Sequence, residues 1–268
     1  MTDEPALQTN RATPPPERFE TSDGVGVVYR SWGSQRRGPV VVLHHGFSAN
    51  AILNWELPGV VAALCSAGRR VVALDARGHG ESDAPHGPES YGEARMARDL
   101  HELCDSLGLE EFDLAGYSMG GVVASISAAQ DARVRRLVIS GVGESVVDLG
   151  GVDTRVFATD ALVEILCSGE SATAPDPGVA AFLALAAASH ADRRALAAQA
   201  LAFHKTPVAL DAITAPTLVI AGDADPLAAH PERLAAAIPN ARSRVVPGDH
   251  FTAVGHPDFA AEIVAFFD

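Results

Sequence analysis

The sequence predicts an α/β fold with a mostly parallel, eight-stranded sheet that carries helices on both faces. Continuous β-branched runs, such as Val40–Leu43 and Arg70–Leu74, are typical of strands buried on both faces. Segments with helical spacing of apolar residues alternate with these strands, which favours a parallel sheet. Between residues 143 and 206 the alternation stops, and Ala/Leu-rich helical stretches take its place. We therefore expect a small helical cap inserted after the sixth strand.

Composition limits the class of protein and its partners. The 268 residues are 47% apolar and 20% charged, which suits one folded domain with an insertion. The net charge of −14 argues against nucleic acid or an anionic membrane as partner. The N-terminus has no secretory pattern, and the longest near-apolar stretch, Val179–Ser189, is too short to span a bilayer. We expect a cytoplasmic protein that acts on a small molecule, with its three cysteines reduced and in the core.

The chain divides into an arm, a two-part core and the cap. Residues 1–17 are polar and proline-rich and are expected to form a flexible arm. The core is expected over residues 18–142 and 207–268, with the cap over residues 143–206. The core strands are expected at Phe19–Ser22, Val25–Trp32, Val40–Leu43, Arg70–Leu74, Phe112–Ala115, Val134–Ser140, Thr217–Ala221 and Arg242–Val246. Helices are expected at Leu53–Ala67, Tyr91–Leu107, Gly121–Gln130, Thr159–Ser168, Val179–Phe203, Pro231–Ala237 and Asp258–Phe267.

One short stretch carries the clearest chemical signal. Gly116-Tyr117-Ser118-Met119-Gly120 matches the G-x-S-x-G nucleophile elbow, with a predicted strand before it and a predicted helix after it. Such a tight turn holds the serine in a strained conformation, and the flanking glycines avoid clashes with neighbouring backbone. We expect Ser118 to project from the end of its strand as a nucleophile.

A serine nucleophile needs a base and an acid that orients the base. After the cap, Asp223 and Asp225 follow one predicted strand and His250 follows the next, so all three lie near the carboxyl ends of parallel strands. A less favoured placement of the acid is Glu144 or Asp148, which follow the sixth strand. Neither a Cys/His cluster with metal spacing nor a phosphate-binding loop is visible, so we expect no metal and no cofactor.

These motifs resemble the α/β-hydrolase fold superfamily, in its cap-bearing group of esterases, lactonases, cofactor-free haloperoxidases and carbon–carbon bond hydrolases. The resemblance covers about residues 19–143 and 206–268. It implies Asp225 as the acid, since that residue stands three after Gly222, and His250 as the base. It also implies that His45-Gly46-Phe47 is the oxyanion loop, with the amides of Phe47 and Met119 as donors.

The resemblance also implies the class of reaction. Epoxide hydrolases and haloalkane dehalogenases of this fold use an aspartate at the elbow, so Ser118 favours a carboxylic-ester hydrolase that works through an acyl-enzyme. The alternatives are a carbon–carbon bond hydrolase or a thioesterase, and a non-catalytic ligand-binding member of the fold. We expect an apolar substrate pocket lined by His44, Tyr117, Phe157 and Phe182.

Four residues of the neighbouring loops are expected to have supporting roles. His44, which could also touch substrate, and His79 are expected to hold their loops through hydrogen bonds. Asp75 and Arg77 are expected to fix a loop through an ion pair.

Overall fold

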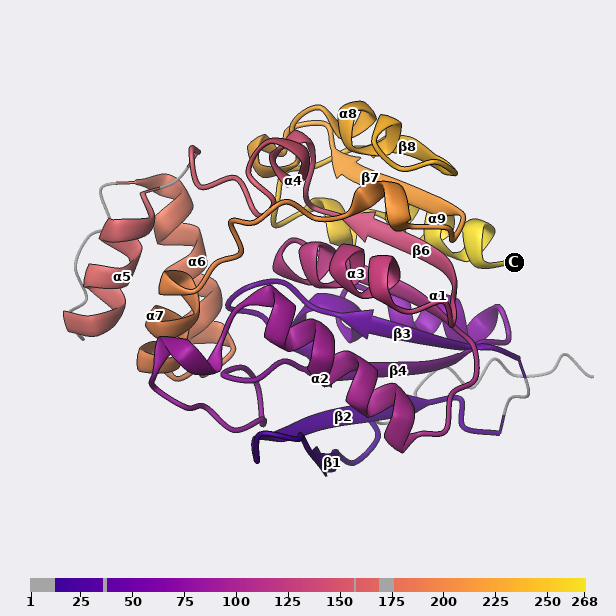
Figure 1. Cartoon of the computed structure of the whole chain (residues 1–268), viewed down its shortest axis with the longest axis horizontal. Helices are drawn as coiled ribbons and strands as arrows, with labels where there is room; N and C mark the ends of the chain where they lie inside the picture. Colours follow the sequence, from indigo (N-terminus) through magenta and orange to yellow (C-terminus); the bar gives the residue numbers. More distant parts are fainter. Residues whose placement is uncertain (1–12, 36–37, 157, 169–175) are drawn as a thin grey trace, which may run out of the picture.

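The computed structural model describes residues 13–35, 38–156, 158–168 and 176–268. Its centre is an eight-stranded sheet in the order β1-β2-β4-β3-β5-β6-β7-β8 (Figure 1). Strands β1 and β2 pair antiparallel, β2 is antiparallel to β4, and the remaining neighbours are parallel. The strands are β1 (Glu17–Glu20), β2 (Gly26–Trp32), β3 (Val40–His44), β4 (Arg70–Asp75), β5 (Phe112–Tyr117), β6 (Val134–Ser140), β7 (Thr217–Gly222) and β8 (Ala241–Val246). The predicted fold class is confirmed.

Helices cover both faces of the sheet, and the continuous apolar strands follow from that arrangement. In β3, Val40 and Val42 pack into the core beneath α2 (Glu93–Ser106) and α3 (Met119–Gln130), while Val41 and Leu43 pack into the core beneath α1 and α9. Figure 1 shows α2 and α3 in front of the strands and α1 behind them. The helices of the second face are α1 (Val60–Ser66) and α9 (Pro257–Phe267). Successive side chains of a strand point to opposite faces, so a strand covered on both sides must be apolar throughout.

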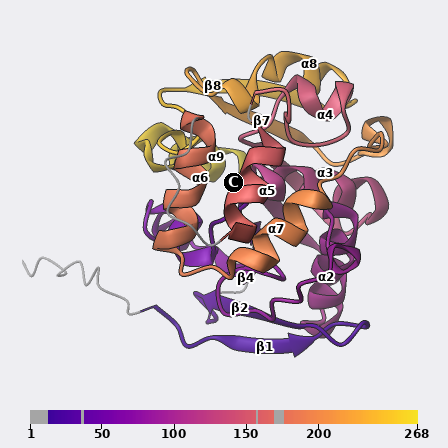
Figure 2. The same cartoon turned by 90° about the vertical axis from the view of Figure 1, so that its left-hand side faces the viewer.

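The segment between β6 and β7 is helical, as predicted. It contains α4 (Glu144–Asp148), α5 (Thr159–Ser168), α6 (Pro177–Ala188) and α7 (Arg193–Leu201). Helices α5, α6 and α7 gather beyond one end of the sheet, whereas α4 packs beside α8 (Pro231–Ala236) (Figures 1 and 2). Short 3₁₀ turns connect the elements at Pro88–Ser90, Leu210–Ala212, Pro226–Ala228 and Ala253–Gly255. No described helix has both the length and the apolar content needed to cross a bilayer.

Two helices predicted as continuous are each broken in the structure. The helix expected over Leu53–Ala67 is a π-helical turn, η1 (Ile52–Glu56), followed by α1, because Gly59 adopts a left-handed φ of 89° between them. The helix expected over Val179–Phe203 is split into α6 and α7. There His190 has a φ of 53°, and the Asp192 carboxylate caps α7 by accepting hydrogen bonds from two backbone amides.

The N-terminal arm and the cysteines also differ from expectation. Strand β1 already begins at Glu17, whereas residues 1–12 of the predicted arm lie outside the described residues. Of the three cysteines, Cys104 is buried, Cys65 is half-buried and Cys167 is exposed on α5.

A buried carboxyl group joins the core to the end of the helical segment. Glu93, at the start of α2, is fully buried, and one of its carboxyl oxygens accepts a 2.7 Å hydrogen bond from the amide of His204. Beside it, the amide of Gly92 donates to the side-chain oxygen of Gln199 on α7 at 3.3 Å. Burial raises the pKa of Glu93 to about 7, so this contact changes charge near neutral pH.

This pKa gives a test of the contact by Glu93→Gln. The folded protein holds the proton more tightly than the unfolded chain, so the contribution of Glu93 to stability is fully present below pH 4.5 and is lost as pH rises through about 7. Glutamine keeps the acceptor oxygen and never ionises. The variant should therefore gain stability over the wild type between pH 5 and pH 8.5, by on the order of 3 kcal/mol. Urea denaturation at several pH values measures the gap, and the same change at exposed Glu89 should reproduce the wild-type curve. A difference in unfolding free energy between Glu93→Gln and the wild type that does not vary with pH would contradict the raised pKa of Glu93.

Candidate active site

The turn at Ser118 is fixed by close backbone approaches. Ser118 joins β5 to α3 with φ 55° and ψ −118°, and its amide donates a 2.7 Å hydrogen bond to the carbonyl of Ser140 on β6. A Cβ atom on Gly116 would lie 1.9 Å from the carbonyl oxygen of Gly120, and one on Gly120 would lie 2.1 Å from that of His44. Neither position has room for a side chain, so both must be glycine.

The structure brings Ser118, His250 and Asp225 together, with each residue at most 6% exposed. His250 Nε2 lies 3.0 Å from Ser118 Oγ, and His250 Nδ1 lies 2.9 Å from Asp225 Oδ2. The other oxygen of Asp225 accepts from the amide of Leu227 at 2.9 Å. With Nδ1–H donating to the carboxylate, Nε2 is left to accept the proton of the serine hydroxyl.

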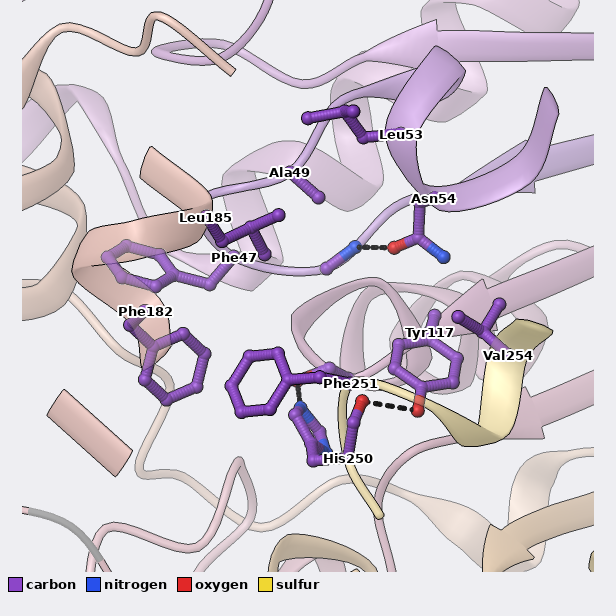
Figure 3. Close-up of a pocket in the computed structure, with 12 residues that line it drawn as sticks. Phe47, Ala49, Leu53, Asn54, Tyr117, Phe182, Leu185, His250, Phe251 and Val254 are labelled. Carbon is purple, nitrogen blue, oxygen red and sulfur yellow. Dashed lines mark hydrogen bonds between the residues drawn. The ribbon is translucent and has the colours of Figure 1, made fainter. Parts of the chain in front are cut away.

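Tyr117 ties the loop of His250 to the elbow. Its hydroxyl donates a 2.7 Å hydrogen bond to the carbonyl of His250, drawn as a dashed line in Figure 3. Burial, with a smaller contribution from Asp225, raises the pKa of Tyr117 well above its usual value, so the donor keeps its proton. The histidine is thus held from its backbone as well as through its ring.

The other candidate acids lie elsewhere. One carboxylate oxygen of Asp223 accepts a 2.9 Å hydrogen bond from the amide of Gly248. Glu144 and Asp148 both pair with Arg233, Asp148 at 3.0 Å. Asp223, Glu144 and Asp148 therefore have structural partners of their own, and Asp225 is the candidate acid that contacts His250.

The expected oxyanion loop runs directly beside Ser118. A Cβ atom on Gly46 would lie 3.2 Å from that of Ser118, and the Gly46 amide donates a 2.9 Å hydrogen bond to Asn54 Oδ1. Phe47 follows Gly46, and Met119 is the first residue of α3. Within the described parts of the chain, neither of their amides donates to another protein group. Asn54 could not be predicted to belong to the site, because its link to the loop depends on how η1 folds back.

A small cavity of about 120 Å³ opens beside Ser118. Of the predicted pocket residues, Tyr117 and Phe182 line it, and Phe157 lies outside the described residues; Phe47, predicted as an oxyanion donor, lines it as well. Its further lining was not predicted and comprises Gly46, Ala49, Leu53, Asn54, Leu185, Phe251 and Val254, besides Ser118 and His250 (Figure 3). The Phe182 ring packs edge-on against Phe47 at 5.7 Å and against Phe251 at 5.4 Å between ring centres. Phe182 and Leu185 come from α6, so the helical segment supplies part of the wall.

The sequence and structure can now be compared with known proteins. Residues 39–163 match the family model described as the alpha/beta hydrolase fold. Across 94% of the chain the structure matches a hydrolase from Pseudomonas aeruginosa, with 98% of that chain covered, 28% identity and a TM-score of 0.74. The chain has the α/β-hydrolase fold.

Further similarities to known proteins cover different shares of those proteins. An enol-lactonase from Burkholderia xenovorans matches over 94% of the chain and 99% of its own, with 25% identity and a TM-score of 0.73. A non-heme chloroperoxidase from Streptomyces lividans is 36% identical over 44% of the chain and 42% of its own length. A putative 2-succinyl-6-hydroxy-2,4-cyclohexadiene-1-carboxylate synthase from Bacillus subtilis is 32% identical over 54% of the chain and 51% of its own. The chain thus spans about half the length of these two curated relatives.

Three neutral histidines support the loop beside Ser118. His45 Nε2 accepts a 2.9 Å hydrogen bond from the Ala76 amide, so its Nδ1 carries the proton and donates to the Gly46 carbonyl at 2.7 Å. The Nδ1 atoms of His44 and His79 donate to the carbonyls of His45 and Arg77 at 3.1 and 3.0 Å. Burial lowers the pKa of His44 and of His79 to about 4 and that of His45 well below its usual value.

One predicted role of His44 is corrected by this arrangement. It supports the loop, as expected, but it is completely buried at the end of β3 and does not line the pocket.

The loop after β4 is held by different pairs from the one predicted. Asp75 does not pair with Arg77; it accepts a 2.9 Å hydrogen bond from the Ala51 amide. The fully buried guanidinium of Arg77 instead binds Asp99 at 2.7 Å and Asp23 at 2.9 Å. The predicted ion pair between Asp75 and Arg77 was wrong, because Arg77 pairs instead with Asp23 and Asp99, which are distant in sequence and meet it only in the folded chain.

Within residues 13–35, 38–156, 158–168 and 176–268, no group of His, Cys, Asp or Glu side chains is arranged to hold a metal ion.

Asn54→Ala tests whether the loop beside Ser118 acts in turnover. Loss of its bond to Gly46 should let the Phe47 amide move, which weakens a contact made to the transition state rather than to the bound substrate. We expect kcat to fall about tenfold with little change in KM, less than the 10²–10³ typical of losing a donor. Kinetics with p-nitrophenyl acetate measure the effect, and Asn240→Ala, at an exposed site, is the control. A rise in KM at constant kcat would instead make Asn54 a simple binding contact.

Proposed function

We propose that the protein hydrolyses carboxylic esters through an acyl-enzyme formed on Ser118. The observation that carries the proposal is the pair of hydrogen bonds made by His250, one to Ser118 Oγ and one to Asp225. A serine hydroxyl is a weak nucleophile until an oriented base accepts its proton. This arrangement supplies both the base and the group that orients it.

The reaction follows from these positions. Ser118 Oγ attacks the ester carbonyl carbon while His250 Nε2 takes the hydroxyl proton. The carbonyl oxygen becomes negative and accepts hydrogen bonds from the amides of Phe47 and Met119, each worth about 3 kcal/mol in the transition state. Asp225 stabilises the charged imidazole, which then gives its proton to the departing alkoxide oxygen. Water, deprotonated in turn by His250, attacks the acyl carbon and releases the acid.

The walls of the cavity favour an uncharged acyl group. Its lining is mostly aromatic and aliphatic, and none of the described residues that line it is a lysine or arginine to pair with a carboxylate. Epoxide hydrolases are among the curated relatives, but the serine at position 118 argues against epoxide chemistry here. The similarity to an enol-lactonase supports an ester-like bond as the target. Residues 143–206 would act as the cap of this site, because α6 contributes Phe182 and Leu185 to its walls.

Substitutions in the triad test the proposal. Ser118→Ala should lower kcat for p-nitrophenyl butyrate by about 10⁶, and Asp225→Asn by about 10⁴, since each removes a member of one catalytic unit. Asp223→Asn is the matched control and should keep the wild-type rate. A fluorophosphonate probe should label the wild type at Ser118 and leave Ser118→Ala unlabelled.

Two outcomes would change the assignment. If Asp223→Asn loses activity and Asp225→Asn keeps it, the acid is Asp223. A wild type that is labelled by the probe and inert to every ester would point to carbon–carbon bond hydrolysis or to thioesters, and an unlabelled wild type to a binding protein.

Phe182→Ala tests the acyl wall. Removing this ring enlarges the cavity between α6 and the oxyanion loop, so longer acyl chains should be accepted. Across p-nitrophenyl esters of increasing acyl length, the preference should shift to longer chains by up to about tenfold per added methylene. Phe266→Ala, an equal deletion on α9 away from the cavity, should leave the ranking unchanged. An identical ranking in Phe182→Ala and wild type would remove Phe182 from the acyl site.

A further inference from the structure

A second hollow adjoins the cavity beside Ser118. This outer groove has a volume of about 470 Å³ and is more open than the inner cavity. The two share Leu53, Phe251 and Val254, so the same side chains form the boundary between them. The two hollows therefore lie next to each other, on either side of these three residues.

The inner cavity is too small for more than one short arm of an ester. At about 120 Å³ it is smaller than the roughly 150 Å³ cavity that accommodates a benzene molecule in another protein. Sites for whole organic ligands usually measure about 300–1,000 Å³. The outer groove, at about 470 Å³, is the larger of the two hollows, so the larger arm of a substrate has more space there than inside.

The mechanism decides which arm lies in the groove. One wall of the groove is the segment from Pro247 to Pro257, which carries His250 itself. His250 Nε2 must reach the oxygen of the leaving alcohol in order to protonate it. The alcohol therefore departs along this segment, while the acyl group lies against Phe47 and Phe182 on the inner side.

The chemistry of the groove defines the ligand. Leu53 and Pro58 form the opposite wall, and Val254, Pro247 and Pro257 continue the apolar lining. None of the described residues that line the groove carries a carboxylate, a guanidinium or an ammonium group; its one imidazole, that of His256, accepts a 3.3 Å hydrogen bond at Nδ1 from the amide of Asp258. The hydroxyl of Thr252 is already engaged with Asp249. Such a surface binds hydrocarbon rather than a phosphate, a sugar or a charged head group.

We propose that the outer groove is the alcohol site, and that the natural substrate joins a short, uncharged acyl group to a larger apolar alcohol, alkyl or aryl. This assignment rests on the proposed ester hydrolysis for its orientation. The volumes, the shared boundary and the position of His250 each support the same division of the substrate. Phe251, which is 37% exposed and touches both hollows, separates the two arms.

Gly255 offers a way to fill the groove without touching the inner cavity. It lines the groove but not the inner cavity, and a Cβ atom added there would meet no other atom within 4 Å. Gly255→Phe therefore places a ring in the groove with little strain. Gly38→Phe is the matched control, because Gly38 has equally open surroundings. It lies before the start of β3, whereas Ser118 follows the end of the neighbouring strand β5, so the two are at opposite ends of the strands.

The first measurement is the ratio of kcat/KM for hexyl acetate to that for ethyl acetate. Gly255→Phe should lower this ratio at least about tenfold, since the ring occupies the space of the longer alcohol. Gly38→Phe should leave the ratio at the wild-type value. Circular dichroism and melting curves check that both variants fold. If Gly255→Phe does not fold, Pro58→Glu on the opposite wall carries the same expectation, because it places a charge against the hydrocarbon.

The second measurement is independent of catalysis. Calorimetry or saturation-transfer NMR should show 1-hexanol binding to the wild type and to Gly38→Phe, and binding at least about tenfold weaker to Gly255→Phe. A hexanol affinity and an ester ratio that are both unchanged in Gly255→Phe would overturn the alcohol site while leaving the ester hydrolase intact. Loss of hexanol binding in Gly255→Phe with no ester cleaved by any protein would support the groove and refute the ester reaction.

Discussion

The candidate site depends on the close packing of backbone around Ser118. A non-glycine residue with φ 55° and ψ −118° is strained, at a cost on the order of 1–3 kcal/mol, and persists only where its surroundings fix it. Here the amide of Ser118 is bonded to β6, while Gly120 lies against the carbonyl of His44 at the end of β3. Three neighbouring strand ends therefore meet at one residue. Ser118, the loop that carries Gly46 and Phe47, and His250 all take their positions from that junction.

Burial gives the same junction its electrostatic character. The imidazoles of His44, His45 and His79 are fully buried with lowered pKa values, so they support the loop as neutral hydrogen-bonding groups near pH 7. The aromatic ring of Phe182 packs against Phe47 on the other side and keeps solvent from the loop. In such a setting two backbone donors interact with a developing negative charge far more strongly than they would in water.

Local sequence patterns predicted the parts of the molecule that obey local rules. The buried strands and the elbow depend on residues close together in the chain, whereas the choice of Asp225 over Asp223 came from the resemblance to the α/β-hydrolase fold superfamily. Other features depend on contacts distant in sequence and could not be predicted. Arg77 meets Asp23 and Asp99, and Asn54 meets Gly46, only after the sheet and η1 have formed. The break at Gly59 was hidden because the apolar spacing continues through it, and the outer groove is built from two segments almost two hundred residues apart.

The hydrogen bond from Tyr117 to the carbonyl of His250 has a consequence for how the protein is made. It joins positions separated by 133 residues, and the contact between Ser118 and His250 spans 132. The elbow can be synthesised, and its neighbouring strands folded, well before β8 and the following loop leave the ribosome. Contacts of such long sequence separation form late in folding. A partly synthesised chain, or one cut before β8, therefore carries Ser118 without the histidine proposed as its base, and the proposed reaction requires molecules whose last strand has joined the sheet.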